Sequence, residues 1–141
     1  MEPLLIELTD GSPKVILDDQ NQVFLFEGES RPQDAFKFFD PVIHWLQEYS
    51  KVLYSQKQHL GKNRTMTIQF RLSYLNSPSA KNIKDILSIL ESYCKDGYEV
   101  RVKWFYYKED IDMKELGEEY AKIVEQLPIN LVLIDGAEEK D

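Results

Sequence analysis

The chain has 141 residues, a length that suits one domain, and its 25 acidic and 17 basic side chains give a formal net charge of -8. This acidic balance argues against nucleic-acid binding and against docking on an anionic membrane, because both depend on positive charge. The single cysteine, Cys94, excludes an internal disulfide framework and a multi-cysteine zinc site. We expect one cytoplasmic domain over residues 1–136 and an acidic tail over residues 137–141, with no signal peptide and no membrane span.

The first third of the chain predicts three short strands and a helix. The strands span residues 4–8, 14–18 and 23–27. Gly28 is expected to end the third strand, and a helix is predicted to open at Ser30. Its apolar side chains recur every three or four residues, at Phe39, Val42, Leu46, Tyr49 and Leu53. Pro41 lies inside this pattern and is expected to kink or split the helix.

After a predicted loop at residues 60–64, strands alternate with helices. Residues 65–74 and 98–107 alternate apolar and polar side chains strictly, and residues 129–134 predict a last strand. The element order is therefore βββαβαβαβ, with the later strands parallel through right-handed crossovers. Because two of these strands show only one apolar face, we predict two layers: a mixed sheet of about six strands with three helices mostly on one face.

The starts of the second and third helices can be predicted from capping residues. Ser77 is expected to be the N-cap of the second helix, with Pro78 as its first residue. Asp112 and Glu115 are spaced as a capping box for the third. This last helix is expected to bury Ile123.

Candidate catalytic and metal-binding residues are sparse. His44 and His59 are the only histidines, and neither has a second metal ligand three or four residues away. Cys94 lies on the apolar face of its predicted helix, which favours a core cysteine over a nucleophile. The acidic run from Glu109 to Glu119 suits the dipole of a helix start, and a small metal-dependent enzyme using this run is the alternative. No phosphate loop or hydrolase motif is present, so we expect no catalysis, no metal and no cofactor.

Basic residues gather on the polar faces of the two alternating strands. Arg71, Arg101 and Lys103 are predicted to form a basic patch on the open face of the sheet if these strands are neighbours. Such a patch suits docking of an acidic partner. Ordinary solvated side chains are the alternative.

The strand-to-helix junction is the most informative segment for function. Its sequence, Asn76-Ser77-Pro78-Ser79-Ala80-Lys81, is a complete helix start without any ligand. The same geometry holds a hydroxyl at a helix N-terminus, where the dipole and free N–H groups favour an anion. Ser77 is therefore also a candidate acceptor of a phosphoryl group, which adds charge without unfolding the segment.

Three stretches of the sequence carry a resemblance to a known family. They are Phe38-Phe39-x-Pro41-Val42-Ile43-x-Trp45-Leu46-x-x-Tyr49, Leu72-x-Tyr74-Leu75-Asn76-Ser77-x-Ser79-x-Lys81 and Asp112-Met113-x-Glu115-x-Gly117-Glu118-Glu119-Tyr120. Their order and spacing resemble those of the SiaC family of bacterial regulatory phosphoproteins, and the likeness spans nearly the whole chain. The resemblance implies a STAS-like fold, which agrees with the two layers predicted above.

The resemblance also implies a phosphorylation site. Family members are phosphorylated at the residue after the asparagine, which is Ser77 here, and Ser79 is a fallback acceptor. Pro78 stands where the family has a serine, and it removes one backbone N–H from the surroundings of a phosphate. The partner is expected to contact the junction at Asn76, Pro78 and two positions that should be exposed, Lys81 and Asn82.

The partners implied by the resemblance are all proteins. They are a Ser/Thr kinase related to histidine-kinase ATPases, a PP2C-like phosphatase and a diguanylate cyclase. The chain would thus be a non-catalytic switch in cyclic-di-GMP signalling, controlling biofilm formation or motility. A STAS-type partner-switching antagonist of an anti-sigma factor is the alternative.

Overall fold

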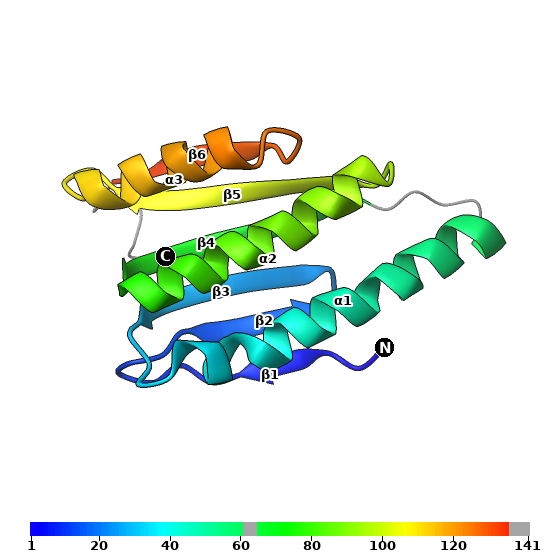
Figure 1. The fold of residues 1–141 in the computed structure, drawn as a ribbon, viewed down its shortest axis with the longest axis horizontal. Coiled ribbons are helices and arrows are strands. Elements are labelled where there is room, and N and C mark those ends of the chain that lie inside the picture. Colours follow the sequence, from blue (N-terminus) through cyan, green and yellow to red (C-terminus); the bar gives the residue numbers. More distant parts are fainter. Residues whose placement is uncertain (61–64, 136–141) are drawn as a thin grey trace.

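Six strands form one sheet whose spatial order follows the chain, from β1 to β6, in the computed structural model (Figure 1). The structure describes residues 1–60 and 65–135. The elements are β1 Leu4–Ile6, β2 Lys14–Asp18, β3 Val23–Ser30, α1 Ala35–Leu60, β4 Thr65–Leu75, α2 Ser77–Lys95, β5 Glu99–Tyr107, α3 Ile111–Ile123 and β6 Ile129–Ile134. The β1–β2 and β2–β3 pairs are antiparallel, and β3 to β6 are parallel. The predicted mixed topology is confirmed.

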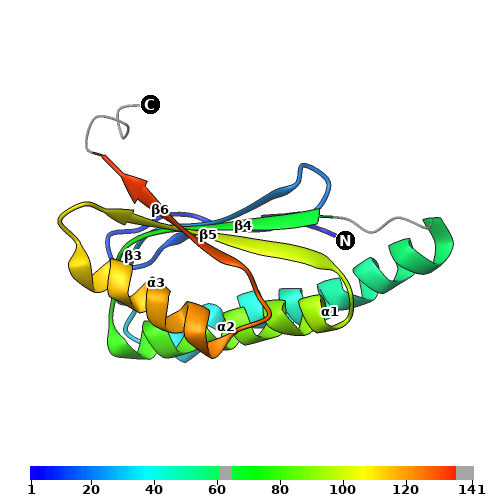
Figure 2. The same cartoon turned by 90° about the horizontal axis from the view of Figure 1, so that it is seen from above.

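The three helices cover one face of the sheet and leave the other face open (Figure 2). The two layers predicted from the alternation of β4 and β5 are therefore confirmed, and they agree with the STAS-like fold that the resemblance implies. A strand covered on both faces would need apolar residues at every position, whereas these strands alternate.

The core lies between the helices and the covered face of the sheet. Large side chains from neighbouring strands stack there, with the rings of Phe26 and Phe70 4.8 Å apart and nearly parallel. Trp104, also fully buried, donates a 2.9 Å hydrogen bond from Nε1 to the carbonyl of Met113 in α3. Gly117 lets α3 approach this indole, since a Cβ there would lie 2.4 Å from Trp104 Cδ1. These contacts fix the start of α3 against β5.

The first strands differ from the prediction at their ends. β1 stops at Ile6, and β3 continues through Gly28 to Ser30. Gly28 does not end the strand, because its φ of 114° allows a bulge at which the register with β4 shifts. A side chain at Gly28 would also collide with Leu8 Cδ1 at 2.5 Å. The bulge carries Ser30 up to the edge of the sheet where α2 begins.

Helix α1 begins later than predicted and is not split. Its first residue is Ala35, five residues after Ser30, because Asp34 caps it by accepting a 3.1 Å hydrogen bond from the Lys37 N–H. Pro41 is the seventh residue of the helix and lies on its exposed side, where the carbonyl that loses its N–H partner can be solvated. The buried stripe on either side of Pro41 keeps the helix continuous.

Helix α3 also begins at a different cap from the predicted one. Asp110, not Asp112, accepts a 3.0 Å hydrogen bond from the Met113 N–H. Ile123 is 45% exposed, contrary to the prediction, because the helix ends there and the chain turns so that Val124 is buried instead. Such boundaries depend on where the preceding loop ends.

Two predictions fall partly or wholly outside the described residues. These are the acidic tail at 137–141 and, beyond Leu60, the loop at 60–64. Among the helices in the described ranges, none combines the length and the apolar character that crossing a bilayer requires.

Candidate functional site

The site lies at the edge of the sheet where β4 ends and α2 begins. Asn76 continues the strand, with φ of -75° and ψ of 168°, and its N–H donates a 2.9 Å hydrogen bond to the Ser30 carbonyl. Its side-chain Oδ1 then accepts a 2.9 Å hydrogen bond from the Ser79 N–H. Asn76 is therefore the N-cap, and the prediction of Ser77 as N-cap is wrong. The extended backbone of β4 runs through Asn76, and asparagine caps a helix as well as serine does.

Ser77 occupies the first position of α2 and is exposed. Within the described residues its hydroxyl makes no hydrogen bond. Pro78, the next residue, is also exposed. The helix has no acidic residue in its first turn, so the positive end of its dipole is not neutralised there. The Ser77 hydroxyl is thus free to react and lies where an added anion is electrostatically favoured.

Ser79 has the opposite environment. It is fully buried, and its hydroxyl accepts a 2.8 Å hydrogen bond from the Ser30 hydroxyl, which is also fully buried. A kinase could reach Ser79 only after the first turn of α2 had opened. The geometry thus favours Ser77 over the fallback acceptor.

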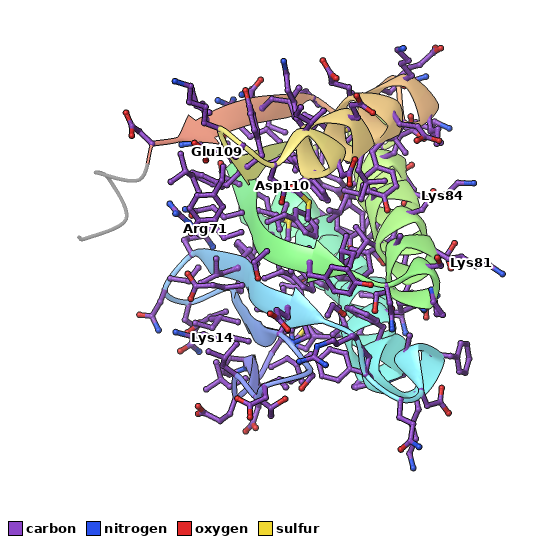
Figure 3. The ribbon with its side chains drawn as sticks, turned by 90° about the vertical axis from the view of Figure 1, so that its left-hand side faces the viewer. Lys14, Arg71, Lys81, Lys84, Glu109 and Asp110 are labelled. Atoms are coloured by element: carbon purple, nitrogen blue, oxygen red, sulfur yellow. The ribbon has the colours of Figure 1, made fainter. Side chains whose placement is uncertain are left out.

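The remaining predicted contact residues also divide into exposed and buried side chains. Lys81 is exposed, and Figure 3 shows it pointing away from the sheet together with Lys84. Asn82 was expected to be exposed but is only 7% exposed, because its Nδ2 donates a 2.9 Å hydrogen bond to the carbonyl of Pro78. Asn82 braces the first turn from inside, whereas Lys81 and Pro78 face solvent.

The start of α3 flanks the junction. The Tyr120 hydroxyl donates a 2.6 Å hydrogen bond to the carbonyl of Ala80 and so ties α3 to the first turn of α2. Between the end of β4 and the start of α3 lies a small cavity of about 190 Å³, lined by Ser73, Tyr74, Leu75, Asp110, Asp112, Met113 and Leu116. Tyr74 is half exposed at its rim. Sequence reasoning missed the roles of Ser30 and Tyr120, because both act through partners about 40 or more residues away.

The acidic run does not assemble a metal centre. Asp110 is used as a helix cap, and Glu109 and Asp112 are exposed. Within residues 1–60 and 65–135, no group of three His, Cys, Asp or Glu side chains is arranged to hold a metal ion. The metal-dependent alternative therefore has no candidate site in this part of the chain.

The other candidate nucleophile and ligands lie apart from the junction. His44 and His59 are both exposed on α1. Cys94 lies near the end of α2, where its Sγ donates a 3.5 Å hydrogen bond to the Val100 carbonyl. Burial raises the pKa of the Cys94 thiol, so it stays protonated near neutral pH. This environment is that of a structural cysteine.

The three basic residues of the open face are brought onto neighbouring strands, as predicted. Figure 3 shows Arg71 on the side of the sheet opposite Lys81. Its guanidinium lies 3.8 Å from the centre of the Phe105 ring, and its Nε donates a 2.9 Å hydrogen bond to Gln69. Arg101 and Lys103 lie on β5 beside β4, with Arg101 3.9 Å from Glu99.

Comparison with known proteins identifies the family. The model of the SiaC family of regulatory phosphoproteins matches residues 6–134. The chain belongs to the SiaC family. This membership confirms the resemblance predicted from the sequence, and with it a regulatory rather than a catalytic protein.

Solved SiaC structures share the whole fold. SiaC of Pseudomonas aeruginosa is 27% identical, with a TM-score of 0.79, and the match covers 95% of this chain and 100% of that one. A match of the same identity and TM-score, over 93% of this chain and 99% of the other, comes from a crystal structure of the diguanylate cyclase SiaD in complex with its activator SiaC from that bacterium. An uncharacterised protein of Pseudomonas aeruginosa strain UCBPP-PA14 is 29% identical over 122 residues, covering 86% of this chain and 90% of its own length.

Proposed function

We propose that this SiaC family member is a binding switch that activates a diguanylate cyclase and is controlled by reversible phosphorylation of Ser77. The observation that carries the proposal is the exposed Ser77 hydroxyl at the first position of a capped helix. The likeness to SiaC, which is named as the activator of SiaD in their complex, supports the choice of target. A kinase and a phosphatase would act on the protein in the cytoplasm.

Phosphorylation of Ser77 changes the surface charge and leaves the fold in place. The Ser77 Oγ attacks the γ-phosphorus of ATP, ADP leaves, and the hydroxyl proton passes to a base of the kinase. The product carries about -1.5 to -2 charges at neutral pH. Because Asn76 and not Ser77 caps the helix, no native hydrogen bond is lost. Lys81, four residues further along α2, is placed to pair with the phosphate.

The phosphate alters which partner can bind. An acidic partner surface that contacts Lys81 and Pro78 is repelled by the new charge and must also desolvate it. A phosphatase with basic residues gains from the same anion. Phosphorylation of Ser77 therefore releases one partner and recruits another.

The test measures cyclic-di-GMP synthesis and binding with the diguanylate cyclase of the same bacterium. Wild-type protein is expected to stimulate the cyclase, and Ser77→Asp to bind it at least about 10-fold more weakly, or about 1.4 kcal/mol. Ser88→Asp is the matched control, since it adds the same charge to an exposed position of α2 remote from the junction. Ser88→Asp should behave as wild type.

Mass spectrometry after incubation with the cognate kinase and ATP tests the mark itself. Phosphate should be found on Ser77 and be absent from Ser77→Ala. Labelling of Ser79 in the folded protein would contradict the assignment. Capture of an anti-sigma factor instead of a cyclase would favour the alternative antagonist function.

A further inference from the structure

The sheet has two edge strands, and they differ in how open they are to pairing. β1 is only three residues long and follows Pro3, and a short edge limits pairing with other chains. β6 has six residues, Ile-Asn-Leu-Val-Leu-Ile, without a charge or a proline. In the part of the chain that the structure describes, β6 pairs with β5 alone. Its outer row of backbone groups is thus a template for another strand.

A groove beside β6 is lined by apolar side chains and by equal numbers of basic and acidic ones. Leu133 is 48% exposed, and Ile111, at the start of α3, is 62% exposed. Both line this groove, which has a volume of about 450 Å³. The charged residues of this groove are two lysines and two glutamates: Lys108, Lys114, Glu115 and Glu118. The lining of this groove therefore carries no net charge, in a protein whose net charge is -8.

We propose that β6 pairs with β6 of a second copy of this chain, antiparallel about a two-fold axis, so that the two sheets join into one. A two-fold axis places the same strand on both sides of an interface, and antiparallel pairing lets a strand pair with its own copy. The strand is uncharged, so no like charges lie opposite each other across the new pair.

The faces of the strand agree with this symmetry. Leu131 lies on the covered face, where a Cβ on Gly117 would come within 2.7 Å of it. Ile129 and Leu133 share that face by alternation. With the axis perpendicular to the sheet through Leu131, these three side chains meet their counterparts beneath the two α3 helices. The interface therefore extends the existing core.

The pairing leaves the Ser77 junction free. The strands of the two copies run in opposite directions across the axis, so the two α2 starts lie at opposite ends of the joined sheet. Dimerisation is thus independent of the proposed phosphorylation switch. Ser77→Asp should dimerise as the wild type does, and the dimer can be tested even if the switch proposal fails.

The experiment is sedimentation equilibrium of the full chain between about 1 and 300 µM, a range that covers dissociation constants typical of modest interfaces. The wild type is expected to reach twice the mass of one chain. Leu133→Lys, which places a charge on the open edge, should raise the dissociation constant 10-fold or more. Leu5→Lys is the matched control on the opposite edge, where Leu5 is 63% exposed, and it should dimerise normally. Asn130→Lys repeats the test at an exposed position of β6 should Leu133→Lys fail to fold.

Hydrogen exchange locates the contact. Amides of β6 should become more protected as the concentration rises, and those of β1 should not. A wild type that stays monomeric over the whole range, or one weakened by Leu5→Lys and not by the β6 variants, would overturn the proposal. If the full chain stays monomeric and a variant without residues 136–141 dimerises, this segment and not a second copy occupies the edge in the full chain, and the proposal is overturned.

Discussion

The Ser30 hydroxyl donates a 2.8 Å hydrogen bond to the Ser79 hydroxyl, and neither side chain is accessible to solvent. The Ser30 carbonyl also accepts a hydrogen bond from the Asn76 N–H. Ser30, at the end of β3, therefore anchors both Asn76, which directly follows β4, and the first turn of α2. The proposed phosphorylation site rests on this support.

Replacing Ser30 by alanine should destabilise the fold by about 1–3 kcal/mol, because the buried Ser79 hydroxyl loses its partner. Chemical denaturation measures the loss. The double variant Ser30→Ala/Ser79→Ala should recover part of it, since both polar groups are then removed. A single variant as stable as wild type would contradict the importance of this bond.

Asn76→Ala should cost about 0.5–2 kcal/mol, the usual price of losing a helix N-cap. Ser77→Ala should change stability by less than about 0.5 kcal/mol, because the Ser77 side chain is exposed and caps nothing. Comparing the thermal unfolding of the two variants shows which of the two residues caps α2. The reverse order of stability would return the cap to Ser77.

Gly117→Ala should destabilise the protein by about 1–3 kcal/mol, since the added methyl group meets the Trp104 indole and Leu131 in a packed core. Tryptophan fluorescence should report the displaced indole. Gly11→Ala is the control, because the nearest atom to its added Cβ is 3.9 Å away. Equal melting temperatures for the two variants would show that α3 can shift at little cost.

The stability should fall as the pH rises above about 10, the ordinary pKa of tyrosine. Burial raises the pKa of both Tyr93 and Tyr120, so the unfolded chain loses these protons at a lower pH than the folded chain does. The stabilisation is complete below the unfolded pKa and is lost as the pH climbs towards the folded one. Tyr120→Phe should flatten this alkaline loss in denaturation curves. Tyr54→Phe, at a residue 61% exposed, should leave it unchanged.

The sequence was sufficient for the arrangement of layers. Alternation through Met66, Ile68 and Phe70 predicted a strand with one buried face, and all three side chains are buried. Together with the same alternation over residues 98–107, it predicted helices on one side of the sheet. It needed only local spacing, which a sequence contains in full.

The details of the site depend on contacts that local spacing does not contain. Ser79 is buried because β3 brings Ser30 to it from 49 residues away. Asn82 turns inward because the Pro78 carbonyl, one helical turn earlier, accepts its side-chain hydrogen bond. The choice of Asn76 over Ser77 as cap depends on how far β4 extends, since both residue types suit the position. The dipeptide alone leaves the two residues as equal candidates.

Helix α1 extends past the elements that pack against it, as Figure 1 shows at its C-terminal end. Leu53 is the last fully buried one of its described side chains, and most of residues 54–59 are exposed, with the Lys57 amine 5.2 Å from the centre of the Tyr98 ring. The hydrogen bonds of this last stretch are therefore held mainly by helix propensity, and they can open at a free energy well below that of global unfolding. A fluorescent label at Ser55 would therefore lie on a helical segment that can move without disturbing the sheet or the junction between β4 and α2.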